Sequence, residues 1–417
     1  MQRRNFLKGA AALLGTIPIN SALSADSASA ALAPSTPALT PSTLSTPLTP
    51  STSALTPEAS AHLLSGSRPL APIIATPDRI IEMNVCTRPF RLQGPRIEFE
   101  RIGRKNVVHN YGHGGSGWSL SWGSGQIAVE MAKAHARKEL AVIGCGAIGL
   151  TTALVAQQAG FKVTIYAKDR HPYASSYRAT GSFTPDSRIV STQFAPAFAN
   201  QWETMARYSF RRFQSYLGVD SHPIEWRDMY SLSDLPFDAP RTPAKSEEPD
   251  YPDLERTLLR DITPQNITVS SHPFPAAYVR RRPALIFNIA EYTRSLMMQF
   301  LAQGGNIETF VMQDVRDFAA IDERSIINCT GYGARALLGD DSIIPVRGQT
   351  AKLIAQPELD YGFFYGSRRV SVYPRRDGLL VQAQAEGDYN NDSEALDPEE
   401  SISAVQRLGE IVAQMRG

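Results

Sequence analysis

The sequence predicts an α/β fold in two parts: a mainly parallel sheet covered by helices, and a second α+β domain built on an antiparallel sheet. Strand and helix patterns alternate over 139–167 and again over 285–329, as in parallel sheets with crossover helices. The chain has 417 residues, of which 42% are hydrophobic and 20% charged. This length and composition are those of a globular enzyme with one large domain or two ordinary ones.

The stretch Glu139 to Ala153 is the strongest single signal in the chain. An apolar strand run ends in Gly144-x-Gly146-x-x-Gly149, and an Ala-rich helix follows to about Ala159. The first glycine allows a tight turn, the second lets a pyrophosphate approach the backbone, and the third lets the helix pack on the strand. The stretch therefore predicts a dinucleotide-binding turn, and the candidate cofactor-binding residues are Gly144, Gly146, Ala147, Ile148 and Gly149.

Two N-terminal segments are expected to lie outside the fold. Residues 1–30 contain Arg3-Arg4 followed by a short apolar run and small residues, which is typical of a twin-arginine signal peptide, with cleavage after Ala25 or Ala30. A retained membrane anchor is the alternative. Residues 31–75 repeat Thr, Pro and Ser and predict a disordered spacer. We expect the twin-arginine export machinery to deliver the folded protein to the periplasm.

A second glycine-rich loop runs from His109 to Ser119, before a helix predicted from about Gln126 to Arg137. Its backbone amides could converge on an anionic or carbonyl oxygen. His109 and His113 lack helical spacing and a third ligand, so no metal is expected.

Charge and cysteine content exclude several other classes of protein. A net charge of +1 gives no electrostatic footprint for nucleic acid. The three cysteines have no metal-binding spacing and are expected to be buried thiols.

Several segments together resemble the family of D-amino-acid oxidases and D-aspartate oxidases. They are CTRPFRLQGPRIE, VVHNYGHGGSGWSLSWG, VIGCGAIGLTTA, VTIYAKDR, SSYRATGSFTP, SIINCTGYGARAL and IIPVRGQTAKL. The resemblance covers nearly everything after about residue 76. It implies FAD as cofactor, a Rossmann-type FAD-binding domain from about 92–190 and 283–343, and an α+β substrate domain from about 76–91, 190–282 and 344–410.

The order of these segments differs from that of the family. The arginine-bearing segment and the glycine-rich loop usually lie near the C-terminus, whereas here they precede the nucleotide turn, so the chain looks circularly permuted. The join would be Lys138-Glu139, and the new C-terminus would be an amphipathic helix over Ser401 to Met415.

The resemblance also implies further FAD contacts. The second glycine-rich loop would stabilise negative charge on the flavin, and the segment after the second strand would bind ribose and phosphate. Asp169 is the nearest carboxylate to the expected ribose position. The remaining implied contacts are Gly114, Gly115, Gly117, Trp118, Ser119, Ser175, Ser176, Gly181 and Gly331.

The reaction implied is oxidative deamination of a D-amino acid, with hydride transfer to flavin and release of a 2-oxo acid and ammonia. Arg88 would bind the substrate carboxylate through a bidentate fork, and the Gly115 carbonyl would accept from the amine. At the spacings of the two active-site tyrosines of the family this chain has Ser367 and Ser371, so Tyr365 and Tyr373 are the candidate replacements. An inward-facing member of the arginine group Arg368, Arg369, Arg375 and Arg376 would suit an acidic substrate.

Some alternatives stay open on the sequence alone. The electron acceptor could be oxygen, giving hydrogen peroxide, or a quinone. The substrate could instead be glycine or another small amine, and loss of the tyrosines could mean a flavin-binding module without activity. Neither the D-amino acid nor the oligomeric state follows from the sequence.

Overall fold

The computed structural model describes residues 70–239, 247–254, 264–385 and 387–416. These belong to one compact unit, Gly66–Gly417. The predicted signal peptide and nearly all of the predicted spacer lie outside the described residues. No helix in the described part of the chain is both long and apolar enough to cross a membrane.

The first sheet, here called the parallel sheet, confirms the predicted α/β class. Its strand order is β2-β3-β10-β4-β5-β9. All neighbouring pairs are parallel except β2 and β3, which form an antiparallel pair. The strands are β2 (Arg96–Ile102), β3 (Lys105–Tyr111), β4 (Glu139–Ile143), β5 (Lys162–Ala167), β9 (Asn306–Thr309) and β10 (Ser325–Asn328).

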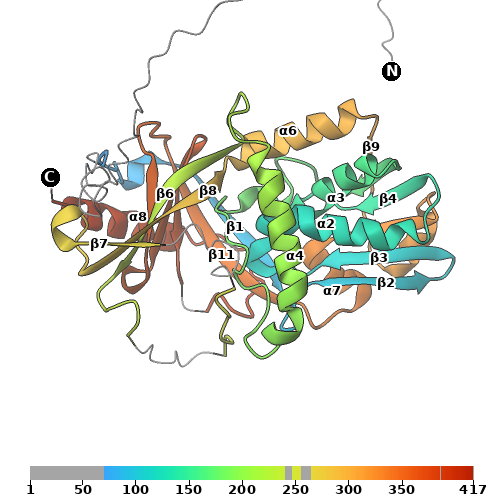
Figure 1. Ribbon diagram of the computed structural model, residues 1–417, viewed down its shortest axis with the longest axis horizontal. Coiled ribbons are helices and arrows are strands. Elements are labelled where there is room, and N and C mark those ends of the chain that lie inside the picture. The colour runs from blue at the N-terminus through green and yellow to red at the C-terminus, as the bar shows by residue number, and fades with distance from the viewer. Residues whose placement is uncertain (1–69, 240–246, 255–263, 386, 417) are drawn as a thin grey trace, which may run out of the picture. The chain divides into compact units, whose positions relative to one another are not determined.

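Helices α2 (Gly117–Lys133), α3 (Ala147–Gln158), α4 (Ala195–Gln214) and α6 (Ile289–Ala302) share one hydrophobic core with this sheet (Figure 1). Glycines on α2 bring the helices close, because a Cβ at Gly123 would collide with the Met205 backbone of α4. At Gly125 a Cβ would lie 3.0 Å from the Thr152 Cα of α3. Helix α4 therefore belongs with the parallel sheet, whereas the sequence placed it in the substrate domain.

The second sheet has the order β1-β11-β14-β13-β12-β6-β8-β7. Only β12 and β6 pair in parallel, and the other neighbours are antiparallel. The strands are β1 (Ile80–Phe90), β6 (Ile224–Ser233), β7 (Gln265–Ile267), β8 (Tyr278–Phe287), β11 (Ile344–Leu353), β12 (Tyr361–Tyr365), β13 (Val370–Arg375) and β14 (Gly378–Ala383).

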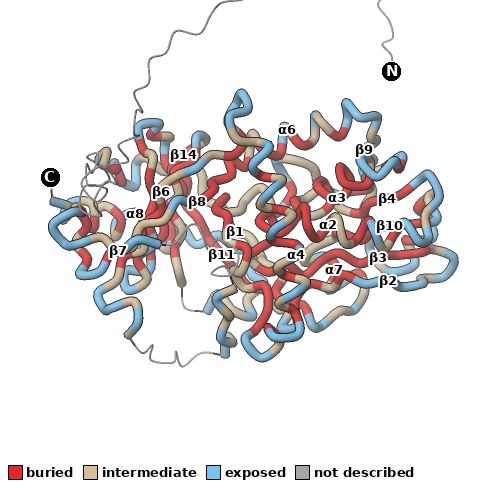
Figure 2. Tube along the Cα trace, viewed as in Figure 1, coloured by how far each residue is buried: buried red, intermediate tan, exposed pale blue. Residues whose placement is uncertain are grey.

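Helix α8 (Pro398–Ala413) covers one face of the second sheet, and buried residues of the helix and of the sheet form one core between them (Figure 2). Its side chains Val405, Leu408 and Ile411 are buried at helical spacing, as the amphipathic pattern predicts. A short helix, α7 (Ala334–Leu338), precedes β11.

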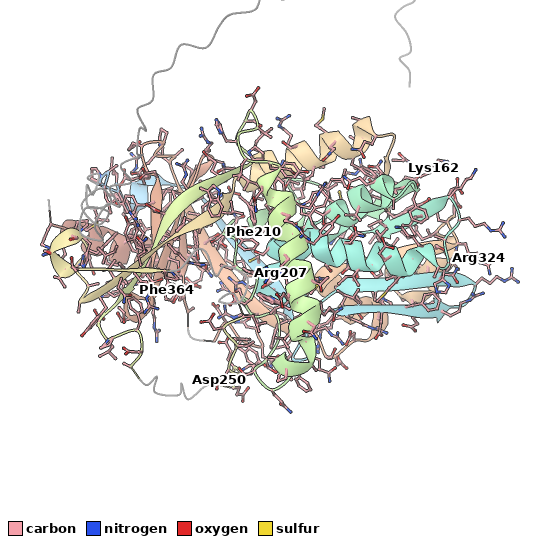
Figure 3. The ribbon with its side chains drawn as sticks, in the orientation of Figure 1. Lys162, Arg207, Phe210, Asp250, Arg324 and Phe364 are labelled. Atoms are coloured by element: carbon pink, nitrogen blue, oxygen red, sulfur yellow. The ribbon has the colours of Figure 1, made fainter. Side chains whose placement is uncertain are left out.

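The carboxyl ends of the parallel strands face the second sheet. Lys162 starts β5 and Arg324 immediately precedes β10, and both lie at the end of the parallel sheet remote from the second sheet (Figure 3). On the opposite side, Arg178, in the segment that follows β5, donates from Nη1 to the Val85 carbonyl of β1 at 3.1 Å. In open α/β sheets ligands bind outside the carboxyl ends of the strands, so this junction is the place to look for a site.

The alternating stretch over 285–329 begins with strand: the apolar run through Phe287 continues β8 and pairs with β6, and α6 starts at Ile289. One predicted helix boundary was wrong. Helix α2 starts at Gly117 rather than Gln126, because its glycines serve close helix packing instead of forming a loop.

Candidate active site

The turn between β4 and α3 has the geometry that its glycines predict. Gly144 has φ +105°, and a Cβ there would lie 2.6 Å from the Cys329 carbonyl oxygen. A Cβ on Gly149 would collide with the Gly144 carbonyl oxygen. Side chains at these two positions would therefore push α3 away from β4 and β10.

Backbone N–H groups converge at the start of α3. The Ala147 amide donates to Ser176 Oγ at 3.0 Å. The amides of Cys145, Gly146 and Ile148 have no acceptor among the described residues. Unpaired amides at a helix N-terminus favour an anion such as a pyrophosphate.

The second glycine-rich loop packs against a turn at Thr184 to Arg188. Gly114 has φ +53°, and a Cβ there would collide with the Arg188 carbonyl oxygen. The Gly115 amide donates to the Ser187 carbonyl at 3.0 Å, and Ser119 Oγ accepts from the Thr184 amide at 2.9 Å. Arg188 itself has φ 49°, a conformation that non-glycine residues seldom adopt outside functional sites.

No sequence pattern singled out this turn. Thr184 lies within the segment SSYRATGSFTP and Ser187 and Arg188 come directly after it, and that proximity was the available signal.

The other predicted FAD contacts fall around these two loops. Trp118 Nε1 donates to the Ser176 carbonyl at 2.8 Å, which joins α2 to the segment beside the nucleotide turn. Gly181 has φ +84° and accepts from the Phe287 amide at 2.6 Å. Gly331 follows Thr330, whose amide nitrogen would lie 3.7 Å from a Cβ on Gly144. Asp169 and Ser175 are exposed just after β5, and Gly117 starts α2.

Arg88 projects from β1 toward the same junction. Its Nη1 donates to the Arg347 carbonyl at 2.5 Å, and its guanidinium lies over Gly348, where a Cβ would collide with it. No acidic side chain of the described residues lies within 4.0 Å of the guanidinium nitrogens. The carboxyl of Asp388 interacts with Arg88 electrostatically at longer range, and the remaining N–H groups of Arg88 can bind a carboxylate.

Tyr373 shares the sheet face of Arg88. Arg88 lies opposite Val346 of β11. Tyr373 lies opposite Leu380, and Leu380 in turn lies opposite Lys352 of β11. Val346, Gly348 and Lys352 are separated by even numbers of residues along β11, so these positions face the same side of the sheet. Tyr373 packs against Met229, Ala284 and Ile286. Burial raises the pKa of its hydroxyl, against the opposing effects of Ser371 and of three arginines, Arg88, Arg282 and Arg188.

Tyr365 does not belong to the site, and that prediction is corrected. It pairs with Val370, so it points to the opposite face, which α8 covers. Its hydroxyl donates to Asp234 Oδ1 at 2.5 Å and lies 3.1 Å from the Pro275 carbonyl. Tyr365 is a core residue.

The four arginines predicted to suit an acidic substrate either bind other protein groups or are exposed. Arg375 pairs with Asp377 and donates to the Ala179 carbonyl, whereas Arg376 pairs with Glu225. Arg368 and Arg369 are exposed. The arginines that influence Tyr373, besides Arg88, are instead Arg188 and Arg282.

The two histidines of the glycine-rich loop are buried and bonded to protein groups. His109 Nε2 lies 2.9 Å from Glu100 Oε2, and His113 Nε2 lies 2.6 Å from Ser124 Oγ. Among the described residues no cluster of three or more metal-ligating side chains occurs.

All three cysteines are free thiols. Cys145 and Cys329 are buried, as predicted, and burial raises their thiol pKa values to about 11 and about 12. Cys86 is only partly buried.

The chain belongs to the FAD dependent oxidoreductase family, whose sequence profile matches residues 39–131 and 139–416. Within that class it is similar to D-amino-acid oxidases. The enzyme of Dictyostelium discoideum is 26% identical over 284 residues, which cover 66% of this chain and 75% of that protein. The enzyme of Streptomyces coelicolor is 26% identical over 295 residues, covering 67% of this chain and 79% of that protein.

Solved structures give a more distant likeness. The glycine oxidase from Geobacillus kaustophilus superposes with a TM-score of 0.48 at 15% identity, covering 67% of this chain and 80% of that one.

The cofactor of this family is FAD, and the site residues fit it. The unpaired amides of Cys145, Gly146 and Ile148 provide donors for the pyrophosphate at the start of α3. The glycine positions keep the backbone of this turn free of side chains. The second glycine-rich loop, Gly114 to Ser119, would border the flavin.

Proposed function

We propose that the chain catalyses the FAD-dependent oxidation of D-amino acids to 2-oxo acids and ammonia. The observation that carries the proposal is Arg88, whose guanidinium forms no ion pair within 4.0 Å among the described residues and which lies on the face of the second sheet that also carries Tyr373. A bidentate guanidinium in such a place suits an α-carboxylate. The similarity to D-amino-acid oxidases supports the same substrate class.

The residues of the chain bind and orient the substrate. Bound FAD supplies a two-electron acceptor for the α-hydrogen of the substrate. Arg88 binds the carboxylate, and its bond to the Arg347 carbonyl together with the bare backbone of Gly348 fixes the guanidinium plane. The Gly115 carbonyl accepts from the amine, and Tyr373 borders the reacting centre. The N-terminal end of α2 favours negative charge beside it.

The imino acid formed by this oxidation reacts with water to give the 2-oxo acid and ammonia. The two electrons then pass to oxygen, which becomes hydrogen peroxide, or to a quinone. We propose that this takes place in the periplasm after twin-arginine export, on the basis of the N-terminal sequence alone.

Substitution of Arg88 tests the proposal. Arg88→Ala should lower kcat/KM for D-amino acids by roughly 100-fold or more, because a buried charge pair with the substrate is lost. Arg88→Lys should restore little, because an ammonium cannot form the fork. Both variants should retain FAD. The Arg316→Ala variant is the control, since Arg316 is exposed and pairs with the nearby Asp314, far from the site in the chain. Unchanged kcat/KM in Arg88→Ala would reject the assignment.

We also propose that the segment order reflects circular permutation. The two segments matched by the family profile are separated at 132–138, between the end of α2 and the start of β4. Leu70 and Ile73, near the start of the described chain, pack in the same core cluster as Ile411 and Met415 of the C-terminal region. The two ends of the fold therefore lie close enough for an alternative connection.

A further inference from the structure

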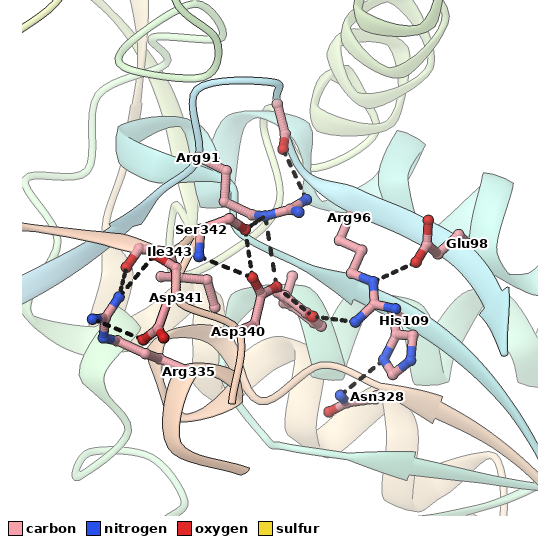
Figure 4. A network of polar contacts seen from close by, with 12 residues as sticks. Arg91, Arg96, Glu98, His109, Asn328, Arg335, Asp340, Asp341, Ser342 and Ile343 are labelled. Atoms are coloured by element: carbon pink, nitrogen blue, oxygen red, sulfur yellow. Dashed lines mark hydrogen bonds and ion pairs between the residues drawn. The ribbon is translucent and has the colours of Figure 1, made fainter. Parts of the chain in front are cut away.

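A series of polar contacts links the end of β1 to the residues after β10, and Figure 4 shows Arg91, Asp340, Arg96, His109 and Asn328 of this series. We call it the Arg91–Thr330 network. Its members, in order of contact, are Arg91, Asp340, Tyr111, Arg96, Glu100, His109, Asn328 and Thr330.

The network begins next to the substrate-binding arginine. Arg91 lies three residues after Arg88, just past the end of β1. Its Nε donates to Ser342 Oγ at 2.9 Å and lies 3.7 Å from Asp340 Oδ2. Its side-chain stem lies against Gly112, because a Cβ on Gly112 would come within 2.5 Å of Arg91 Cδ. Arg91 thus touches both the strand that carries Arg88 and the start of the second glycine-rich loop.

Tyr111 forms the middle of the network. Its hydroxyl donates to Asp340 Oδ2 at 2.8 Å and accepts from Arg96 Nη1 at 2.9 Å. Asp340 lies in the connection between α7 and β11, the strand against which Arg88 rests. Tyr111 is fully buried, so its hydroxyl relies on these two partners for its hydrogen bonds.

The network ends at the nucleotide turn. Arg96 Nη2 donates to Glu100 Oε2 at 3.0 Å, and the same carboxylate oxygen lies 2.9 Å from His109 Nε2. His109 is buried, and burial lowers its pKa. Its Nε2 donates to Glu100, because a carboxylate oxygen only accepts. Its Nδ1 accepts from the Asn328 amide at 3.2 Å, and Asn328 Oδ1 accepts from Thr330 Oγ1 at 2.9 Å. The Thr330 amide nitrogen lies 3.7 Å from where a Cβ on Gly144 would be.

We propose that the Arg91–Thr330 network positions Arg88 relative to the cofactor-binding turn, with Tyr111 and Asp340 as positioning residues. The inference rests on the proposed function, because it assigns the network to the binding of a carboxylate substrate. The two ends belong to different sheets, and the polar contacts between them fix the separation of the substrate-binding and pyrophosphate-binding ends of the site. A guanidinium that is not held in place binds a carboxylate more weakly, because ordering it on binding costs free energy.

Tyr111→Phe tests this role, because it removes both bonds of the hydroxyl with little change in volume. We expect the substrate dissociation constant, from the concentration dependence of anaerobic flavin reduction, to rise about tenfold, while the reduction rate at saturation falls less than threefold. The dissociation constant of propionate, a carboxylate with no amine to oxidise, should rise similarly when titrated calorimetrically into FAD-loaded protein. Asp340→Asn keeps an acceptor for the Tyr111 hydroxyl, so it should raise the substrate dissociation constant less than Asp340→Leu does.

A double-mutant cycle with Arg88→Ala separates positioning from a general structural role. If Tyr111 acts through Arg88, Tyr111→Phe should change the second-order rate of flavin reduction less than twofold in the Arg88→Ala background. Tyr332→Phe is the matched control, since its hydroxyl makes only a 3.4 Å contact with Asp392 outside the network. Effects of Tyr111→Phe that are equal in both backgrounds, or no rise in the propionate dissociation constant, would overturn the positioning role. Failure of every D-amino acid to reduce the wild-type flavin would reject the proposed function and the positioning role together.

Discussion

Gly348 lies directly beneath the guanidinium of Arg88, and a Cβ at this position would collide with it. Gly348→Ala should therefore displace the substrate-binding group without removing it. We expect KM for D-amino acids to rise roughly tenfold and FAD affinity to stay unchanged, measured by steady-state kinetics and flavin titration. Gly366→Ala is the control on the same sheet, because its Cβ would meet only the Phe364 ring at 3.4 Å. Equal kinetics for Gly348→Ala and wild type would contradict the placement of Arg88.

Asp388 should make the free energy of unfolding of the protein depend on pH. Burial raises the pKa of its carboxyl to about 6, and repulsion from Glu400 acts in the same direction. Attraction to Arg88, Arg347 and Arg188 lowers the pKa and opposes this rise. An unfolded aspartate has a pKa of about 3.9, so the folded state binds this proton more tightly. The contribution of the protonated group to stability is fully present below about pH 4 and is lost as the pH rises through about 6.

Asp388→Asn should remove this dependence. Urea unfolding at several pH values should show the free energy of unfolding of the wild type falling, relative to the variant, between about pH 4 and pH 7. Parallel pH profiles for the two proteins would show that Asp388 titrates normally.

The start of α3 depends on the closeness of two backbone segments. Gly149→Ala would force the helix away from the Gly144 carbonyl oxygen and disturb the amides that face the pyrophosphate. We expect the FAD dissociation constant to rise at least about tenfold, as measured by fluorescence titration of the apoprotein. Gly333→Ala, at the start of α7, should bind FAD normally, since the nearest atom to its Cβ is 3.9 Å away. Normal FAD binding by Gly149→Ala would place the pyrophosphate elsewhere.

Short-range patterns in the sequence predicted the elements around the nucleotide turn well. The predicted alternation over 139–167 corresponds to β4, α3 and β5, and β4 and α3 flank the glycines as expected. The turn is encoded within a few residues, so local spacing is sufficient. Helix α4 and the end of β8 were misplaced because their partners, α2 and β6, are distant in sequence.

Which of the two candidate tyrosines can lie at the site depends on the sheet face to which its side chain points. Tyr365 and Tyr373 are both near the expected positions in sequence, but β13 register separates them onto opposite faces. Arg88 could be assigned from a motif, whereas the bare Gly348 beneath it and the Arg91–Thr330 network arise only from tertiary contacts.

At the scale of the whole molecule, permutation predicts that another chain order yields the same protein. A rearranged chain would begin at Glu139, run to Arg416 and continue through a short Gly/Ser linker into residues 70–133. It should fold, bind FAD with an affinity within about threefold of the parent and keep its substrate, because all contacts within the two sheets are retained. An insoluble or FAD-free product would contradict this view.

The central claim is that FAD bound to this chain oxidises D-amino acids. The most direct measurement is the absorbance of the flavin bands in the FAD-loaded protein, lacking the first 30 residues, after anaerobic addition of a mixture of D-amino acids and, separately, of L-amino acids. The account predicts bleaching with the D mixture and none with the L mixture, and in Arg88→Ala little bleaching with either. A flavin that bleaches only with the L mixture, or with neither, would contradict it.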